Sequence, residues 1–266
     1  MSTTADVELG NGAHDGGGLG VDPMHQFEVQ TYFPINIGGL DASFTNASLW
    51  MVLAAITVSF FTVFAIGRRE MVPGRLQSIA ELSYEFVANM VRENAGSAGQ
   101  PYFPFIFTLF MFVLASNMLG MLPYSFTTTS HIIVTFALAA FVFIGVTLVG
   151  LAKHGLHFFS LFAPKGLPVA LLPLIIVIEV ISYLSRPISL SVRLFANMLA
   201  GHTMLKVFSG FVVGFIGAGG LFAGLAIIPM GAMVAFTGLE ILVAFLQAYV
   251  FAILTCIYLN DALHLH

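Results

Sequence analysis

Five long apolar stretches divide the chain, with polar segments between them. The membrane-spanning helices that they predict are residues 48–67, 102–122, 132–152, 167–216 and 221–259. Each of the first three has about the twenty residues that a helix needs to cross a hydrocarbon core of ~30 Å. The pattern therefore predicts an all-α integral membrane protein with five spans.

Residues 75–94 follow a different pattern. Apolar side chains recur there at helical spacing opposite a face of acidic, amide and basic side chains. The segment is too polar to span a membrane, so we expect an amphipathic helix that lies along the membrane surface.

The last two apolar stretches are much longer than a membrane is thick. As helices they would be roughly 60–70 Å long at 1.5 Å per residue, about twice the thickness of the hydrocarbon core. Such helices either bend or lie steeply tilted. The glycine-rich break at residues 217–220 predicts that they form an antiparallel hairpin. The candidate hinges are Pro173, Pro187 and Pro229.

Composition supports a membrane protein and excludes several classes of site. The chain is 58% hydrophobic and 8% charged, whereas about a quarter of the residues of a soluble domain are charged. The single cysteine, Cys256, excludes an intrachain disulfide and a cysteine-rich metal cluster, and it is interpreted as a small buried apolar residue. With no P-loop, GxGxxG or metal-ligand spacing, we expect no metal, cofactor, nucleotide or nucleic acid to bind.

The distribution of charge predicts the topology. Residues 1–67 contain no Lys or Arg and six acids, and they lack the basic start and apolar core of a signal peptide. Residues 1–47 are therefore expected to form a polar tail that crosses the membrane intact, and residues 48–266 a single helical domain. Six of the nine basic residues fall in segments on one side, which the positive-inside rule places in the cytoplasm. These six residues are Arg68, Arg69, Arg75, Arg92, Lys153 and Lys165.

Polar residues follow one face of the first long helix at spacings of three and four. They are Glu179, Ser182, Arg186, Ser189, Arg193 and Asn197. His202, nine residues beyond Arg193, points to a different side of an ideal helix. On the second long helix, Glu240 and Gln247 share a face, and Asp261 lies fourteen residues further on.

Folding the two long helices antiparallel about Gly220 predicts three polar levels. Arg193 comes to lie opposite Gln247, Glu179 opposite Asp261, and His202 one residue out of register with Glu240. A charge at mid-membrane costs about 2.5–3.5 kcal/mol and by default marks a functional site. Titratable groups here flank an arginine that keeps its proton, which suits two proton half-paths separated by a fixed positive charge.

Each polar position also has a structural interpretation. Arg193 could pair with Glu179, although the two lie about 21 Å apart along an ideal helix. His202 and Glu240 could form a satisfied interhelical hydrogen bond. Four charged side chains could simply snorkel to the membrane interface, namely Glu179, Arg186, Lys206 and Asp261. Two amide side chains could serve only helix-to-helix contact, namely Asn197 and Gln247.

The segment "SRPISLSVRLFANMLAGH", residues 185–202, closely resembles the signature of subunit a of the F-type ATP synthase, the stator that faces the ring of c subunits. The resemblance continues at "LEILVAFLQAYVFAILTCIYL", "ASNMLGMLP" and "VPGRLQSIAE", and covers most of residues 48–266.

This resemblance implies roles for individual residues. Arg193 matches the essential arginine that faces the c-ring carboxylate and blocks proton short-circuiting. The other matches are Gln247 beside it, Asn197 one turn on, Glu179 and Asp261 on the inner half-channel, His202 and Glu240 as the outer half-channel pair, and Asn117 on the third helix near the inlet. The common bacterial pattern has Glu at the position of His202 and His at that of Glu240. The exchange in this chain resembles mitochondrial subunits.

The resemblance implies a proton-translocating stator subunit that catalyses nothing alone. Its partners would be the c-ring, the peripheral-stalk b subunits and the rest of the F1Fo complex, with protons and membrane lipid around it. We expect a bacterial inner membrane, with the N-terminus outside and the C-terminus cytoplasmic, and a mitochondrial inner membrane as the alternative.

Two further classes of protein compete with this interpretation. A self-contained proton-coupled secondary transporter would use the long helices as a transport hairpin, but no inverted repeat accompanies them. An intramembrane enzyme needs paired ligands such as HExxH, which are absent from the sequence.

Overall fold

The structure is a computed structural model that describes residues 29–34, 36–37, 40–41, 43–66, 74–122, 125–155, 157–158 and 171–264. Several predictions fall outside these residues: the first part of the N-terminal tail, the basic residues Arg68, Arg69 and Lys165, and the start of the fourth span at 167–170.

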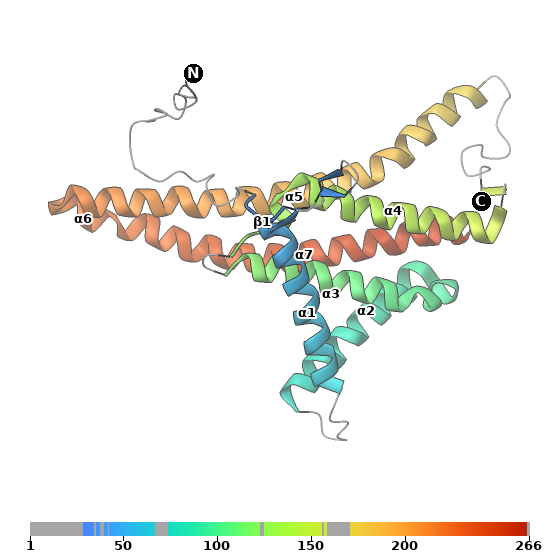
Figure 1. Ribbon diagram of the computed structural model, residues 1–266, viewed down its shortest axis with the longest axis horizontal. Coiled ribbons are helices and arrows are strands. Elements are labelled where there is room, and N and C mark those ends of the chain that lie inside the picture. Colours follow the sequence, from blue (N-terminus) through green and yellow to red (C-terminus); the bar gives the residue numbers. More distant parts are fainter. Residues whose placement is uncertain are drawn as a thin grey trace, which may run out of the picture.

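Five long helices confirm the predicted fold class, because each includes a stretch long and apolar enough to cross a membrane. They are α1 (Asn46–Ile66), α3 (Phe103–Gly120), α4 (Ile132–His154), α5 (Leu172–Ala218) and α7 (Ile227–Leu263). At 1.5 Å per residue, the 47 residues of α5 extend roughly 70 Å. In Figure 1, α3, α4, α5 and α7 run broadly along the long axis of the molecule, and α1 crosses them.

The hairpin of α5 and α7 turns at glycines, as the sequence predicts. α5 ends at Ala218, and Gly219 and Gly220 have φ values of 67° and 59°. A residue with a side chain rarely adopts these angles, whereas glycine does so freely. The short helix α6 (Gly220–Leu225) follows, and α7 begins after Ala226. α5 and α7 then lie side by side in opposite directions (Figure 1).

Only one of the three candidate hinge prolines lies inside a helix. Pro187 is within α5, which changes direction part-way along its length (Figure 1). Pro173 and Pro229 lie in the first turns of α5 and α7, where the missing N–H removes no helical hydrogen bond. Pro173 therefore bends no helix, whereas Pro229 follows the break between α6 and α7 at Ala226.

The amphipathic segment forms α2 (Arg75–Gly99). The buried residues of α2 lie in its C-terminal half and are Val87, Met90, Val91, Ala95 and Gly99. Tyr84 and Phe86 also contact aromatic rings of α3, while Leu76 and Ile79 of the predicted apolar face are exposed. Gly96, with φ 62°, kinks the helix, and the 3-10 turn η2 (Gln100–Tyr102) leads into α3. A location along the membrane surface stays a prediction.

Two short two-stranded sheets precede α1, and the sequence pattern does not predict them. β1 (Thr31–Phe33) pairs with β4 (Phe44–Thr45), and β2 (Asn36–Ile37) pairs with β3 (Leu40–Asp41), both antiparallel. These strands have two or three residues each, too few for an alternating pattern to be recognised.

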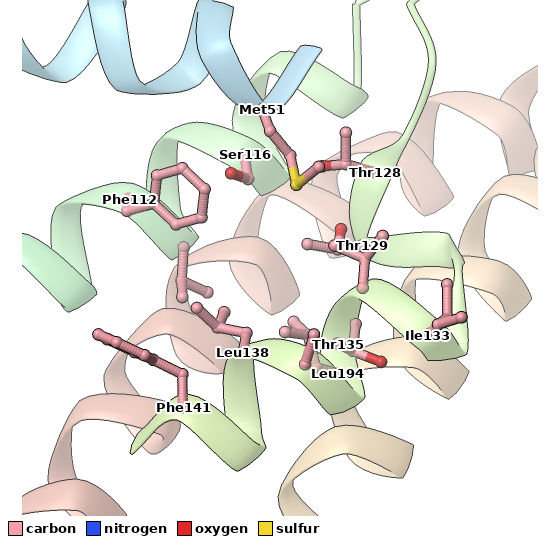
Figure 2. Close-up of a pocket in the computed structure, with 13 residues that line it drawn as sticks. Met51, Phe112, Ser116, Thr128, Thr129, Ile133, Thr135, Leu138, Phe141 and Leu194 are labelled. Carbon is pink, nitrogen blue, oxygen red and sulfur yellow. The ribbon is translucent and has the colours of Figure 1, made fainter. Parts of the chain in front are cut away.

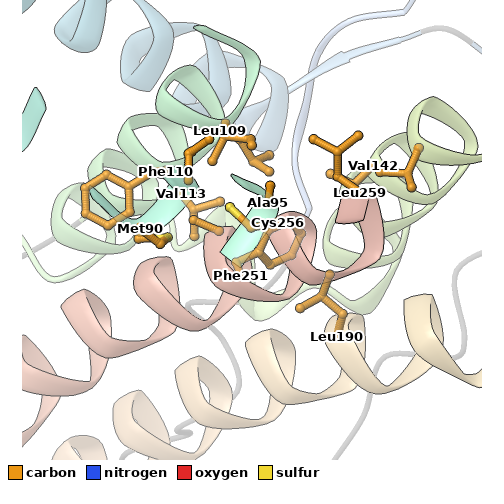
Figure 3. Packing of buried hydrophobic residues seen from close by; sticks show 14 of the residues in the cluster. Met90, Ala95, Leu109, Phe110, Val113, Val142, Leu190, Phe251, Cys256 and Leu259 are labelled. Carbon is orange, nitrogen blue, oxygen red and sulfur yellow. The ribbon is translucent and has the colours of Figure 1, made fainter. Parts of the chain in front are cut away.

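α7 is the central helix of the core, since it contacts α2, α3, α4 and α5. Figure 3 shows its residues Phe251, Cys256 and Leu259 among side chains from all four neighbours. Cys256 is free and fully buried, which confirms its interpretation as a small core residue. A rigid α7 thus holds the polar residues along its length at defined positions.

Candidate functional site

Arg193 lies on an exposed face of α5. Among the described residues it forms no hydrogen bond or ion pair, which leaves the pairing with Glu179 unsupported. The exposed residues around it on this face are Asn197 and three small residues, Ser189, Ala196 and Ala200. Small residues let another helix approach closely, so the guanidinium is placed to meet a group brought by a partner.

Asn197 and Gln247 connect the two long helices one turn beyond Arg193. The Asn197 amide Nδ2 donates to Gln247 Oε1 at 2.9 Å. Gln247 is buried, and its Nε2 has no hydrogen-bond partner in the part of the chain that the structure describes. The sequence prediction placed Arg193 opposite Gln247. The observed partner of Gln247 is Asn197, four residues beyond Arg193, so the observed register of the two helices differs from the predicted one by one helical turn.

Arg186 and Asp261 form an ion pair near the other end of the hairpin. Arg186 Nη1 lies 2.9 Å from Asp261 Oδ2, and the guanidinium lies over the rings of Tyr183 and Tyr258 at 5.4 and 5.0 Å from their centroids. The prediction that Asp261 lies opposite Glu179 is therefore wrong, because Asp261 pairs with Arg186, which lies two turns away from Glu179 on α5. Arg186 has a partner within the protein, which its interpretation as a side chain that snorkels to the membrane interface does not include.

Glu179 is half-buried on α5, at the end of the polar face nearest the start of the helix. No hydrogen bond or ion pair joins its carboxylate to another described residue. It stays available to water or to a partner, and it does not belong to the Arg186–Asp261 pair.

Glu240 lies against α5 at Gly201. A Cβ atom added at Gly201 would overlap Glu240 Oε1, so the absence of a side chain at 201 makes room for the carboxyl group. Glu240 is buried, and neither carboxyl oxygen has a hydrogen-bond partner among the residues described. The two long helices therefore approach each other closely beside His202.

His202 is half-buried and bonds to a residue of the α3–α4 connection. Its Nε2 lies 3.2 Å from Thr127 Oγ1. No hydrogen bond joins His202 to Glu240 in the described structure, so a satisfied interhelical hydrogen bond between the two is not observed.

Asn117 is a fully buried residue of α3 and lies beside the part of α7 that carries Glu240. Its Nδ2 donates to the carbonyl of Ala244 at 3.3 Å, one turn after Glu240. Its Oδ1, the Glu240 carboxyl and Gln247 Nε2 are buried polar atoms without a partner among the described residues, and they follow one face of α7. Buried polar groups usually bond to protein or ordered water, so this row of atoms is suited to binding water.

Sequence reasoning missed two residues of this region. Thr127 connects to His202, and Gly201 accommodates Glu240. The signal for Thr127 was the run of four hydroxyl residues at 127–130, which lies between two apolar spans. The small residue directly before His202 was the signal for the second.

An apolar cavity of about 440 Å³ lies apart from these groups, between α1, α3, α4 and α5. Figure 2 shows its walls, which include Met51, Phe112, Leu138 and Phe141. No titratable side chain lines it, so it does not extend the row of polar atoms on α7. Within the described ranges, no three His, Cys, Asp or Glu side chains come together as a metal site.

Comparison with known proteins places this arrangement in a family. The profile of the ATP synthase A chain family matches residues 48–260. The chain is 62% identical over 250 residues to the ATP synthase subunit a of Parvibaculum lavamentivorans, covering 94% of this chain and 96% of the relative. It is 63% identical over 243 residues to that of Agrobacterium fabrum, covering 91% and 98%. It is 58% identical over 249 residues to that of Pelagibacter ubique, covering 93% and 100%.

Proposed function

The chain belongs to the ATP synthase A chain family, and we propose from this membership that it forms two offset proton half-channels with the c-ring, separated by Arg193. At the coarser level, it is an integral membrane subunit of the Fo sector that serves proton transport and ATP synthesis. The half-channels, the c-ring contact and the role of the arginine are the proposal.

The exposed position of Arg193 is the observation that carries the proposal. A guanidinium keeps its proton at every physiological pH, so it cannot relay protons. It can, however, attract a carboxylate that passes it and favour the ionised form of that carboxylate. A c-ring carboxylate would release its proton before it reaches Arg193 and gain another after it, which forces the ring to turn.

The outer half-path runs along Glu240, His202 and Asn117. Glu240 and Asn117 have buried polar atoms with no partner among the described residues, and half-buried His202 directly follows Gly201, against which Glu240 lies. A carboxyl group and an imidazole can each gain and lose a proton, and the amide can orient water between them. These groups would load the ring from the outside.

The inner half-path centres on Glu179. Its carboxylate is half-buried and forms no ion pair with another described residue, whereas Asp261 is held by Arg186. Glu179 is therefore the better candidate to receive the departing proton, and Asp261 would shape the path through Arg186. Asn197 and Gln247 hold the two long helices together beside Arg193.

The c-ring would dock on the exposed face of α5 that carries Arg193. The neighbours Ser189, Ala196 and Ala200 are exposed and small, so they permit the close approach that a helix of the ring requires. The chain is a member of the F1Fo complex, which includes b subunits, and contacts with b would involve other faces.

Orientation follows from the distribution of basic residues. The N-terminus would lie outside and the C-terminus in the cytoplasm, in the inner membrane of a bacterium. Each proton that crosses supplies about 2.3 kcal/mol per 100 mV of membrane potential, so several are needed for each ATP.

Reconstitution tests this function against a self-contained transporter. Liposomes that contain the purified chain alone should show no proton flux under an imposed potential. Liposomes that contain the complete complex should pump protons when ATP is added. Proton-coupled flux through the chain alone would contradict the proposal and favour the transporter.

A further inference from the structure

Thr127, in the α3–α4 connection, contacts His202 but belongs to neither proposed half-path. It lies directly before the 3-10 turn η3 (Thr128–Ser130) and is buried. Its hydroxyl bonds on one side to the carbonyl of Gly120, at 3.2 Å, and on the other to His202 Nε2, at 3.2 Å. The hydroxyl thus bridges the end of α3 and the ring of His202 on α5.

The direction of these two hydrogen bonds follows from their chemistry. A threonine hydroxyl has one proton to donate, and a carbonyl oxygen can only accept. The geometry gives the proton of Thr127 to the Gly120 carbonyl, whose second lone pair accepts from Ser125 Oγ at 2.8 Å, and Oγ1 is left as the acceptor toward His202. In this arrangement the Nε2 atom of His202 carries a hydrogen and donates it to Thr127 Oγ1.

The position of Thr127 is itself enforced by the surrounding residues. Gly120 has no side chain, and a Cβ atom there would lie 2.9 Å from Thr127 Cγ2. The Gly120 carbonyl is in the last turn of α3, where helical carbonyls lack the usual partner and accept from other groups. The threonine is therefore held by packing as well as by its hydrogen bond.

We propose that Thr127 is a positioning residue that holds neutral His202 in the Nε2–H tautomer, so that Nδ1 is the atom that gains and loses the proton. This inference rests on the proposed outer half-path for its functional meaning. In the neutral imidazole only the unprotonated nitrogen can bind a proton, and the hydrogen bond of the other nitrogen decides which one it is. Two charged or titratable groups face this part of α5: Lys206, one turn on, which acts electrostatically on the ring, and Glu240 of α7, which lies against the preceding residue Gly201.

The chain provides matched variants. Thr127→Val keeps the shape and removes both hydrogen bonds, and Thr127→Ser keeps the hydroxyl. Thr129→Val is the control, because Thr129 is equally buried and its hydroxyl has no hydrogen-bond partner among the described residues.

The direct test is ¹⁵N magnetic resonance of the histidine-labelled complete complex in lipid at alkaline pH, where the imidazole is neutral. The His202 signal is the one lost in a His202→Gln complex. We expect a protonated Nε2 and an unprotonated Nδ1 in the native complex and in Thr127→Ser and Thr129→Val, and a mixture of tautomers in Thr127→Val. An Nδ1–H tautomer in the native complex, or no change in Thr127→Val, would overturn the inference.

Proton pumping separates this inference from the proposed function. Loss of one hydrogen bond should slow ATP-driven pumping in Thr127→Val by about 3- to 10-fold, with rescue in Thr127→Ser and no effect in Thr129→Val. A Thr127→Val complex with the native tautomer but poor assembly would reduce Thr127 to a structural residue of the connection. Normal pumping in His202→Gln would contradict the outer half-path and leave the tautomer assignment intact.

Discussion

Asn197 on α5 donates a hydrogen bond of 2.9 Å to Gln247 on α7, one turn beyond Arg193. The bond joins the exposed face of α5 to the buried face of α7, so it fixes how far the two helices can slide past each other near the arginine. Interhelical hydrogen bonds in membranes contribute about 0.6 kcal/mol on average.

A double-mutant cycle measures this bond. Asn197→Ala and Gln247→Ala should each lower the stability of the complex slightly, and the double variant should be less destabilised than the two effects combined, with a coupling of about 0.6 kcal/mol. Chemical unfolding followed by helical circular dichroism provides the measurement. Strictly additive effects would contradict the bond.

The ion pair of Arg186 and Asp261 predicts similar effects for both partners. Both side chains are partly exposed, so the pair contributes no more than about 1 kcal/mol to stability. Asp261→Asn and Arg186→Gln should reduce pumping to a similar, partial extent, because each change breaks the same contact. If Asp261→Asn abolished pumping while Arg186→Gln preserved it, Asp261 would be a proton relay in its own right.

Gly201 predicts a steric effect on Glu240. In Gly201→Ala the new methyl group occupies the position of the Glu240 carboxyl, so the carboxyl must shift and pumping should fall. The shorter side chain of Glu240→Asp should partly restore pumping in the Gly201→Ala background. Gly210→Ala on the same helix is the control, because no heavy atom lies within 4 Å of the added carbon. Equal loss of pumping in both alanine variants would exclude the proposed clash.

His131 predicts a pH dependence of stability. It precedes α4 and stacks on Phe126, with ring centroids 4.9 Å apart, and burial lowers its pKa from the ordinary value of about 6.5. The folded protein binds this proton less tightly than the unfolded chain does. The stability of the folded state should therefore be full above about pH 6.5 and decline as the pH falls through the lowered pKa.

His131→Phe keeps the aromatic stack and removes the titration. Comparison of Tm for the complex between neutral and mildly acidic pH checks the prediction, and the variant should lose less stability than the native protein. The same acid-induced loss in both proteins would assign the effect to other groups.

The helices could be predicted from the sequence because each apolar stretch is long and its limits are clear. α1, α3 and α4 lie within a few residues of the predicted spans, and the glycine break sets the turn of the hairpin. The hydrophobic pattern depends only on local residues and on the thickness of the bilayer, so no tertiary information is needed.

The pairing along the hairpin could be predicted only near its turn. From the Gly201–Glu240 contact to the Arg186–Asp261 ion pair, the chain advances 15 residues along α5 but 21 along α7. In a fixed antiparallel register, the same number of residues separates two successive contacts on both helices. The assumption of a fixed register fails because α5 contains Pro187 and changes direction part-way along its length (Figure 1). The Thr127–His202 contact joins residues 75 positions apart through an irregular connection, which periodicity cannot reveal.

The most direct test of the two-half-channel account is Arg193→Ala in the assembled complex, with ATP-driven pumping and passive proton leak measured in membrane vesicles. Arg186→Gln is the matched control, since it removes an arginine from the same helix that has a partner within the protein. The account predicts a complex that still assembles but loses coupled pumping and synthesis, while the control keeps part of both. Coupled pumping at the native rate in Arg193→Ala would contradict the account and reduce Arg193 to a structural charge.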